Sequence, residues 1–305
     1  MKAHIFAYIA VNFVLLHLVS LQNAALDQVI YVLCTIAILT LGIAHGAIDN
    51  ILYGTKPGKS NMQFIGKYVI VIFLFAALWI LLPNLAFIIF LIASAYHFGQ
   101  SQLTDYVQKS SLTSKLLFLS WGSIVILLLF HFNSHSFLGL QEGHSQVSAT
   151  TNHLIQNSGY YLLGSGTLCA TAFLYTIKKN QLNIQVPFKE LYVLTLITFS
   201  MYLFPPFIAF SLFFVFIHSF RVVLQEFDYC QESLEIKSLG QFVKLFLPLT
   251  TVSVIGTIAV ILLVYGLDKT EIIPYVLLIL LSCLTIPHAL VMDRFYKFAS
   301  NLSKI

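Results

Sequence analysis

Charged residues are scarce in this sequence. Lys and Arg number 16 and Asp and Glu number 12 among 305 residues, so that 9% of the chain is charged, whereas about a quarter of a typical soluble domain is charged. Hydrophobic residues make up 58% and fall in long runs that are apolar on every helical face, as in segments that cross a bilayer. This composition argues against a soluble fold and predicts an all-α protein, a polytopic bundle of transmembrane helices.

The sequence also lacks two patterns that would indicate other classes of protein. Its four cysteines, Cys34, Cys169, Cys230 and Cys283, form no CxxC pair, which argues against a disulfide framework or a thiolate metal site and predicts small buried thiols. The basic residues are scattered among the connections rather than gathered into a patch with interleaved aromatic residues. We therefore expect no nucleic-acid partner.

Long apolar runs predict the number of helices, because about 20 apolar residues are needed to cross a bilayer. The runs cover residues 5–21, 29–53, 65–82, 84–100, 115–131, 159–177, 190–204, 206–224, 242–265 and 272–290. Prolines separate two pairs of neighbouring runs, at Pro83 and at Pro205-Pro206, where a helix should break or kink. The sequence therefore predicts about ten helices, and eight if both prolines are kinks.

The distribution of basic residues predicts the orientation. With an even number of helices and both termini in the cytoplasm, every basic residue except Lys269 lies on the cytoplasmic side, as the positive-inside rule favours. Residues 132–158, which contain no Lys or Arg, then form an external loop. We expect a single integral membrane domain over residues 1–305, located as a multi-pass protein in the plasma membrane.

Four of the 10 histidines share one predicted depth. His45, His97, His218 and His288 each lie in the cytoplasmic half of a predicted helix, within about 12 Å of the inner boundary at 1.5 Å rise per residue. Ionisable groups inside a membrane are costly and usually face a functional cavity. Neutral imidazole is a common ligand of iron and copper, so the four histidines predict a shared redox-metal site. A haem with two histidine ligands would explain two of them.

The segments around these histidines resemble a known family. HGAID at 45–49, YHFGQS at 96–101, HSFR at 218–221 and PH at 287–288 are similar to the HGALD, HFGQS, HSxR and PH segments of the Brp/Blh family of β-carotene 15,15'-dioxygenases, and they occur in the family's order. The resemblance implies a multi-helix membrane enzyme whose histidines hold ferrous iron, Fe(2+). It implies cleavage of the central double bond of β-carotene with O2 to give two molecules of all-trans-retinal, and a functional link to a retinal-binding rhodopsin.

The resemblance also implies which residues form the site. His45, His97 and His218 match the family's histidines and are expected to be catalytic metal ligands. The family usually carries a further histidine one turn after the third, where this sequence has Val222. Our hypothesis is that His288, at a similar depth, supplies the fourth metal-binding nitrogen.

Neighbouring polar residues are candidates for supporting roles. Asp49 follows His45 by one helical turn, and it either accepts a hydrogen bond that orients that ring or is a solvated carboxylate at the helix end. Tyr96 and Gln100 flank His97, and they either bond near the oxygen or satisfy backbone groups at a helix end.

Three more polar residues lie close to the histidine segments. Gln102 stands where the family resemblance leads us to expect an acidic residue. Arg221 and Glu226 lie at the inner end of a predicted helix, where we expect them to anchor the helix at the membrane interface.

The leading hypothesis is therefore an iron dioxygenase that meets β-carotene and O2 within the lipid bilayer. Two alternatives stay open. A relative that binds carotenoid or retinal without cleaving it would follow from the missing histidine at Val222. A haem-bearing or metal-transporting membrane protein would use the same four histidines.

Overall fold

The computed structural model of the protein describes residues 3–43, 45–54, 62–107, 111–139, 145–269 and 272–302, with the side chains of 138–139, 145–148 and 298–302 left aside. Every regular element in these residues is a helix. Contacts divide the chain into two compact units. Unit 1 comprises Met1–Ile48 and Tyr192–Val254, and unit 2 comprises Asp49–Leu191 and Ile255–Ile305.

The predicted polytopic helical fold is confirmed. Each of the ten apolar runs corresponds to an observed helix, and within the described residues 8 helices are long and apolar enough to cross a membrane. The other two are α5 (Pro83–Leu103) and α9 (Ser158–Lys178). The orientation of the helices, with both termini in the cytoplasm, stays a prediction.

Unit 1 is built around two helices that change from α to π geometry. Its elements are α1 (Ala3–Ser20), α2 (Ala24–Ala37), η1 (Ile38–Gly42), α11 (Pro206–Leu212), η2 (Phe213–Ser219) and α12 (Phe220–Leu234), with parts of α10 (Gln185–Leu203) and α13 (Leu239–Gly266). The π-helical segments η1 and η2 contact each other, and α1 packs against η2. Tyr8 of α1 forms a buried hydrogen bond with Ser200 of α10, which ties the first helix of the chain to this unit.

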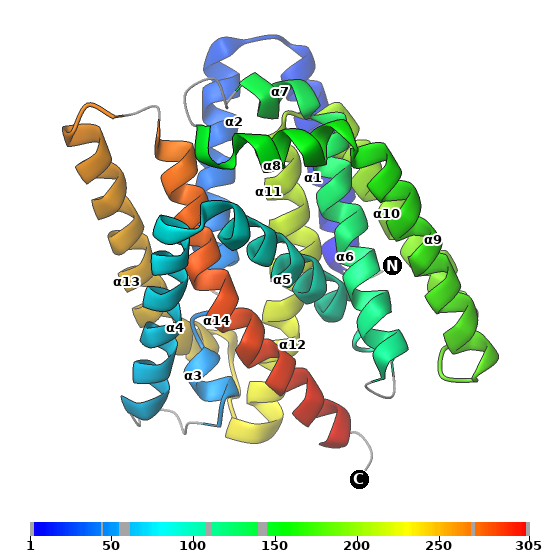
Figure 1. Ribbon diagram of the computed structural model, residues 1–305. Helices are drawn as coiled ribbons and strands as arrows, with labels where there is room; N and C mark the ends of the chain where they lie inside the picture. The colour runs from blue at the N-terminus through cyan, green and yellow to red at the C-terminus, as the bar shows by residue number, and fades with distance from the viewer. Residues whose placement is uncertain are drawn as a thin grey trace. The chain divides into compact units, whose positions relative to one another are not determined.

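Unit 2 contains the remaining elements, which Figure 1 shows as a group of helices of different lengths. They are α3 (Asp49–Leu52), α4 (Met62–Leu81), α5, α6 (Leu112–Phe132), α7 (Ser134–Gly139), α8 (Ser145–Gln156), α9 and α14 (Ile273–Leu302). The helices α5 and α6 cross at very short range because glycines lie at the crossing. A Cβ atom at Gly122 would lie 1.8 Å from the carbonyl oxygen of Ala95, and one at Gly99 would lie 1.8 Å from that of Phe118.

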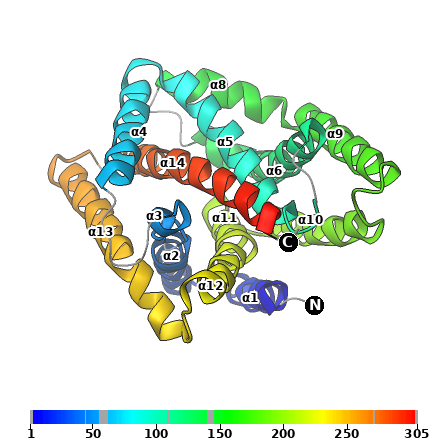
Figure 2. The same ribbon diagram turned by 90° about the horizontal axis from the view of Figure 1, so that it is seen from below.

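The long helix α14 packs against both α4 and α5, as Figure 2 shows. Trp79 of α4 donates a hydrogen bond of 2.7 Å from Nε1 to Oγ of Ser282 on α14, and both side chains are buried. Pro287 lies inside α14, directly before His288. The packing of α14 against α5 places these two histidine-bearing helices side by side.

Several helix boundaries differ from the predicted runs. The run expected over 29–53 ends as a helix at Gly42, and residues 45–48 form a turn before α3. The last run, expected to end at 290, continues as α14 to Leu302. Residues 132–158, the predicted external loop, include α7 and α8, and their position outside the membrane stays a prediction. All four cysteines are free and buried, as expected.

Candidate metal centre

Unit 1 brings two of the predicted histidines together. His45 lies in the turn that follows η1, and His218 lies within η2. Their ring centroids are 5.1 Å apart with an interplanar angle of 89°, and both side chains are buried. The two rings therefore meet edge to face within one unit.

Phe214 and the π geometry position this pair. The Phe214 ring stacks on His218 at 5.5 Å and meets His45 edge-on at 5.7 Å. Gly42 leaves the space that this ring needs, since a Cβ atom there would lie 2.7 Å from Cε1 of Phe214. A π-helical turn is rare and often occurs at a functional site, because the extra residue changes where side chains point. Both histidines are associated with such a segment, because His45 follows η1 and His218 lies within η2.

Unit 2 brings the other two predicted histidines together. His97 of α5 and His288 of α14 have ring centroids 4.9 Å apart and an interplanar angle of 87°. Their residues are 1% and 5% exposed, respectively. The two pairs therefore share the same edge-to-face geometry, although they lie in different units and arise from different elements.

The spacing of each pair suits two ligands of one metal ion. A metal–nitrogen bond of about 2.1 Å places the metal about 3.2 Å from an imidazole centroid, so two rings bound at angles of about 90–109° have centroids about 4.5–5.2 Å apart. The observed separations of 5.1 Å and 4.9 Å fall in this range. Imidazole nitrogens without a thiolate favour a transition metal such as iron or copper over magnesium or calcium.

A carboxylate supports the unit 2 pair. Nδ1 of His288 lies 2.9 Å from Oδ1 and 3.1 Å from Oδ2 of Asp49, and Tyr68 of α4 donates a hydrogen bond of 3.0 Å to Oδ2. Burial raises the pKa of the Asp49 carboxyl, while His288 and Tyr68 act to lower that pKa. The sequence left two roles open for Asp49, orienting His45 or standing as a solvated carboxylate at a helix end. In the structure the carboxylate is buried, and the hydrogen bonds described for it join it to His288 and Tyr68.

Tyr96 and Gln100, the residues that flank His97, share one partner. The hydroxyl of Tyr96 donates to Oδ1 of Asp293 at 3.3 Å, and Nε2 of Gln100 donates to the same atom at 3.0 Å. Lys297 forms an ion pair with the other oxygen, Oδ2. Sequence reasoning missed Asp293, because the last apolar run was expected to end before it. A role for Tyr96 or Gln100 beside oxygen stays a prediction.

The structure also locates the two positions at which the sequence departs from the family segments. Val222 lies in α12 and is fully buried. Gln102 donates from Nε2 to both carboxylate oxygens of Glu190, at 3.2 Å and 3.0 Å, and both residues are buried. An amide at 102 therefore faces a buried carboxylate, where an acid would face another acid.

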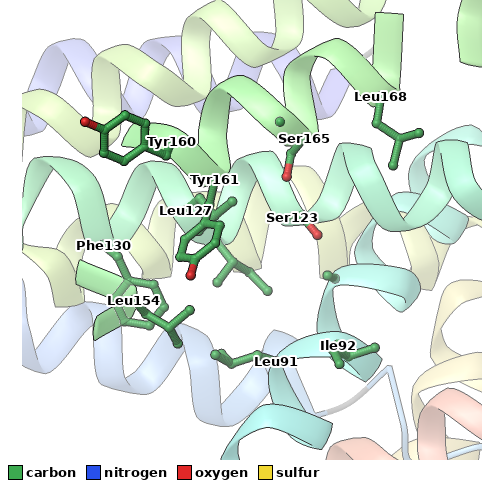
Figure 3. Close-up of a pocket in the computed structure, with 13 residues that line it drawn as sticks. Leu91, Ile92, Ser123, Leu127, Phe130, Leu154, Tyr160, Tyr161, Ser165 and Leu168 are labelled. Carbon is green, nitrogen blue, oxygen red and sulfur yellow. The ribbon is translucent and has the colours of Figure 1, made fainter. Parts of the chain in front are cut away.

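A cavity of about 400 Å³ lies in unit 2 between α5, α6, α8 and α9. Its lining is mostly apolar, and Figure 3 shows Tyr161 and Ser165 of α9 opposite Ser123 of α6. On α5 the cavity is lined by Ala95, which is rotated about 200° around the helix axis from His97. The cavity and the histidine pair therefore lie on different faces of α5.

The other histidines lie apart from these two pairs in the sequence, and most of those that the structure describes are exposed. His131 is exposed and bonds to Ser158, and His153 is exposed and bonds to Tyr161. His17 and His135 are exposed, and His4 is buried. His144 lies outside the described residues. The exposure of His17, His131, His135 and His153 is that of solvated or interfacial histidines, whereas the buried His4 lies inside the protein.

One comparison with known proteins identifies a family. A protein-family model described as "Beta-carotene 15,15'-dioxygenase" matches residues 36–296. That span includes all four histidines of the two pairs, and the match confirms the resemblance seen in the histidine segments. No match was found among curated proteins or among solved structures.

Proposed function

Because the chain belongs to the β-carotene 15,15'-dioxygenase family, we propose that it cleaves the central 15,15' double bond of β-carotene with O2. The carbon–carbon double bond breaks and each of its two carbons gains one oxygen atom, so that one β-carotene and one O2 give two molecules of all-trans-retinal. The observation that carries the proposal is the family match over residues 36–296, which spans both histidine pairs.

We propose that ferrous iron is the cofactor and that His45, His97, His218 and His288 hold it. The spacing of the rings within each pair supports this ligand set. The pairing of His97 with His288 supports the hypothesis that His288 replaces the histidine missing at Val222. Iron, when bound, would supply the activation of O2, which a hydrocarbon substrate without a heteroatom cannot assist.

The chain's own residues orient the histidine rings and exclude water from them. Asp49 accepts a hydrogen bond from Nδ1 of His288, which holds this ring in the tautomer that leaves Nε2 to face a metal. Tyr68 holds the carboxylate in turn. Buried aromatic rings such as Phe214 exclude water around His45 and His218. The bilayer delivers the apolar substrate, and in the plasma membrane the retinal product would be available to a retinal-binding rhodopsin.

Removal of the Asp49 carboxylate tests its orienting role. We expect Asp49→Ala to weaken Fe²⁺ or Co²⁺ binding by about 10–100-fold, because partners that orient metal-binding histidines contribute that much to affinity. Tyr68→Phe keeps the bond between Asp49 and His288, so it should have a smaller effect. Metal titration of the purified proteins measures both, and equal affinity in Asp49→Ala and the native protein would contradict the role.

Expression in bacteria that make β-carotene tests the function directly. Cleavage predicts that the orange colour fades and that retinal appears in extracts. Persistent colour with well-expressed protein would favour a relative that binds carotenoid without cleaving it. Metal analysis and a visible spectrum of the purified protein test the cofactor, since iron without a Soret band supports the proposal and a Soret band indicates haem.

A further inference from the structure

We propose that Asp293 is a positioning residue for His97, acting through the two side chains on either side of it. This inference rests on the proposed metal-binding role of His97 and His288. The carboxylate of Asp293 joins α14 to α5 through Tyr96 and Gln100. It thereby sets the rotation of α5 about its axis, which decides where the His97 ring points.

The register of α5 makes this contact specific. Tyr96 and Gln100 are four residues apart, so they lie on one face, one turn from each other. Both donate to the same atom, Oδ1 of Asp293, and Nε2 of Gln100 is also 3.5 Å from the Tyr96 hydroxyl. Two donors on successive turns that converge on one acceptor resist rotation of α5. His97 follows Tyr96 directly, at about 100° around the helix, so its direction is set by the same contact.

The register of α14 places the acceptor and the partner ring on one rigid segment. Asp293 follows His288 by five residues, which is about 7.5 Å along a helix. The helices α5 and α14 are therefore joined at two levels, by His97 beside His288 and by Tyr96 and Gln100 bonded to Asp293. Lys297 engages Oδ2, which leaves Oδ1 directed to α5.

The geometry separates hydrogen-bond acceptance from charge. Asp293→Asn keeps a carbonyl oxygen that can accept from Tyr96 and Gln100 but removes the carboxylate that pairs with Lys297. Asp293→Leu removes both. If positioning depends on the acceptor, asparagine should restore what leucine loses.

The experiment measures Co²⁺ binding to the purified, metal-free protein, by titration and by the ligand-field absorption of the bound ion. We expect Asp293→Leu to weaken binding by about 10–100-fold, as loss of a group that orients a ligand does, and to alter the absorption spectrum. Asp293→Asn should stay within about threefold of the native affinity with a native spectrum. Ser282→Ala is the matched control, because it removes a different bond of α14, to Trp79, and should leave Co²⁺ binding unchanged.

A second variant covers the case in which Asp293→Leu does not fold. The double change Tyr96→Phe with Gln100→Met removes both donors, leaves Asp293 with Lys297, and should reproduce the loss of affinity. Native Co²⁺ binding in Asp293→Leu or in this double variant overturns the inference, and so does Asp293→Asn binding as weakly as Asp293→Leu. His97→Ala tests the metal site separately from the role of Asp293, since native Co²⁺ binding in that variant would overturn the proposed metal site itself.

Discussion

Replacement of His97 by alanine is expected to remove bound iron and to lower retinal formation by more than about 100-fold, since loss of a direct ligand should exceed the 10–100-fold effect of losing a group that orients one. His97 is 1% exposed and meets His288 edge to face, so its truncation removes a ring from the interior of unit 2. Iron content of the purified protein and retinal in extracts of β-carotene-producing bacteria give the two measurements.

The chain offers matched histidine controls for this experiment. His131→Ala and His153→Ala change exposed rings that bond to Ser158 and Tyr161, and both variants should retain native iron content and activity. If the two pairs bind one shared ion, the native protein holds one iron per chain, and changing either pair removes it. Two irons per chain, lost independently, would contradict the single centre.

The second large effect is expected at the crossing of α5 and α6. A Cβ atom at Gly122 would lie 1.8 Å from the carbonyl oxygen of Ala95, which is backbone and cannot turn aside. Gly122→Ala must therefore push the helices apart, at a cost of about 3 kcal/mol or more, at or beyond the upper end for overpacked cores. We expect little folded protein in membranes and a clearly lower melting temperature in detergent.

A glycine in an open position provides the comparison. Gly166 lies in α9 with nothing within 4 Å of a Cβ atom, so Gly166→Ala should be neutral or slightly stabilising, because alanine has the higher helix propensity. Equal melting temperatures for Gly122→Ala and Gly166→Ala would show that the helices are not in close contact at Gly122.

The helices could be predicted because their signal is local. Each apolar run long enough to span a bilayer corresponds to a helix. This result did not require the glycines of the α5–α6 crossing to be recognised in the sequence. The end of the second run could not be predicted in the same way. The π segment and the turn at 45–48 arise from packing between η1 and η2, which leaves no periodic trace in residues 29–53.

The proposed ligands could be selected from the sequence, whereas their hydrogen-bond partners could not. Shared depth and family resemblance selected His97 and His288, which lie together in unit 2. The partner of Asp49 depends on a contact across 239 residues of sequence, so helical spacing favoured the nearby His45 instead. Asp293 was missed because the last apolar run was expected to end at residue 290, before it.

Arg221 and Glu226 show that a charged residue near the end of an apolar run need not lie at the membrane interface. Both were expected to anchor a helix at the membrane surface, and that expectation is wrong because both are buried, at 4% and 1% exposure. Helix α12, which carries them, extends to Leu234, beyond the predicted end at 224. The longer helix and its packing within unit 1 place these side chains inside the protein.

The proline before His288 has a mechanical consequence. Pro287 lacks the N–H that would bond to the carbonyl of Cys283, and its ring crowds that carbonyl, so α14 bends most easily at this point. His288 and Asp293 both follow the bend, whereas Ser282, with its bond to Trp79, precedes it. A bend of α14 at Pro287 would therefore move His288 and Asp293 together, relative to the half of the helix that is bonded to α4.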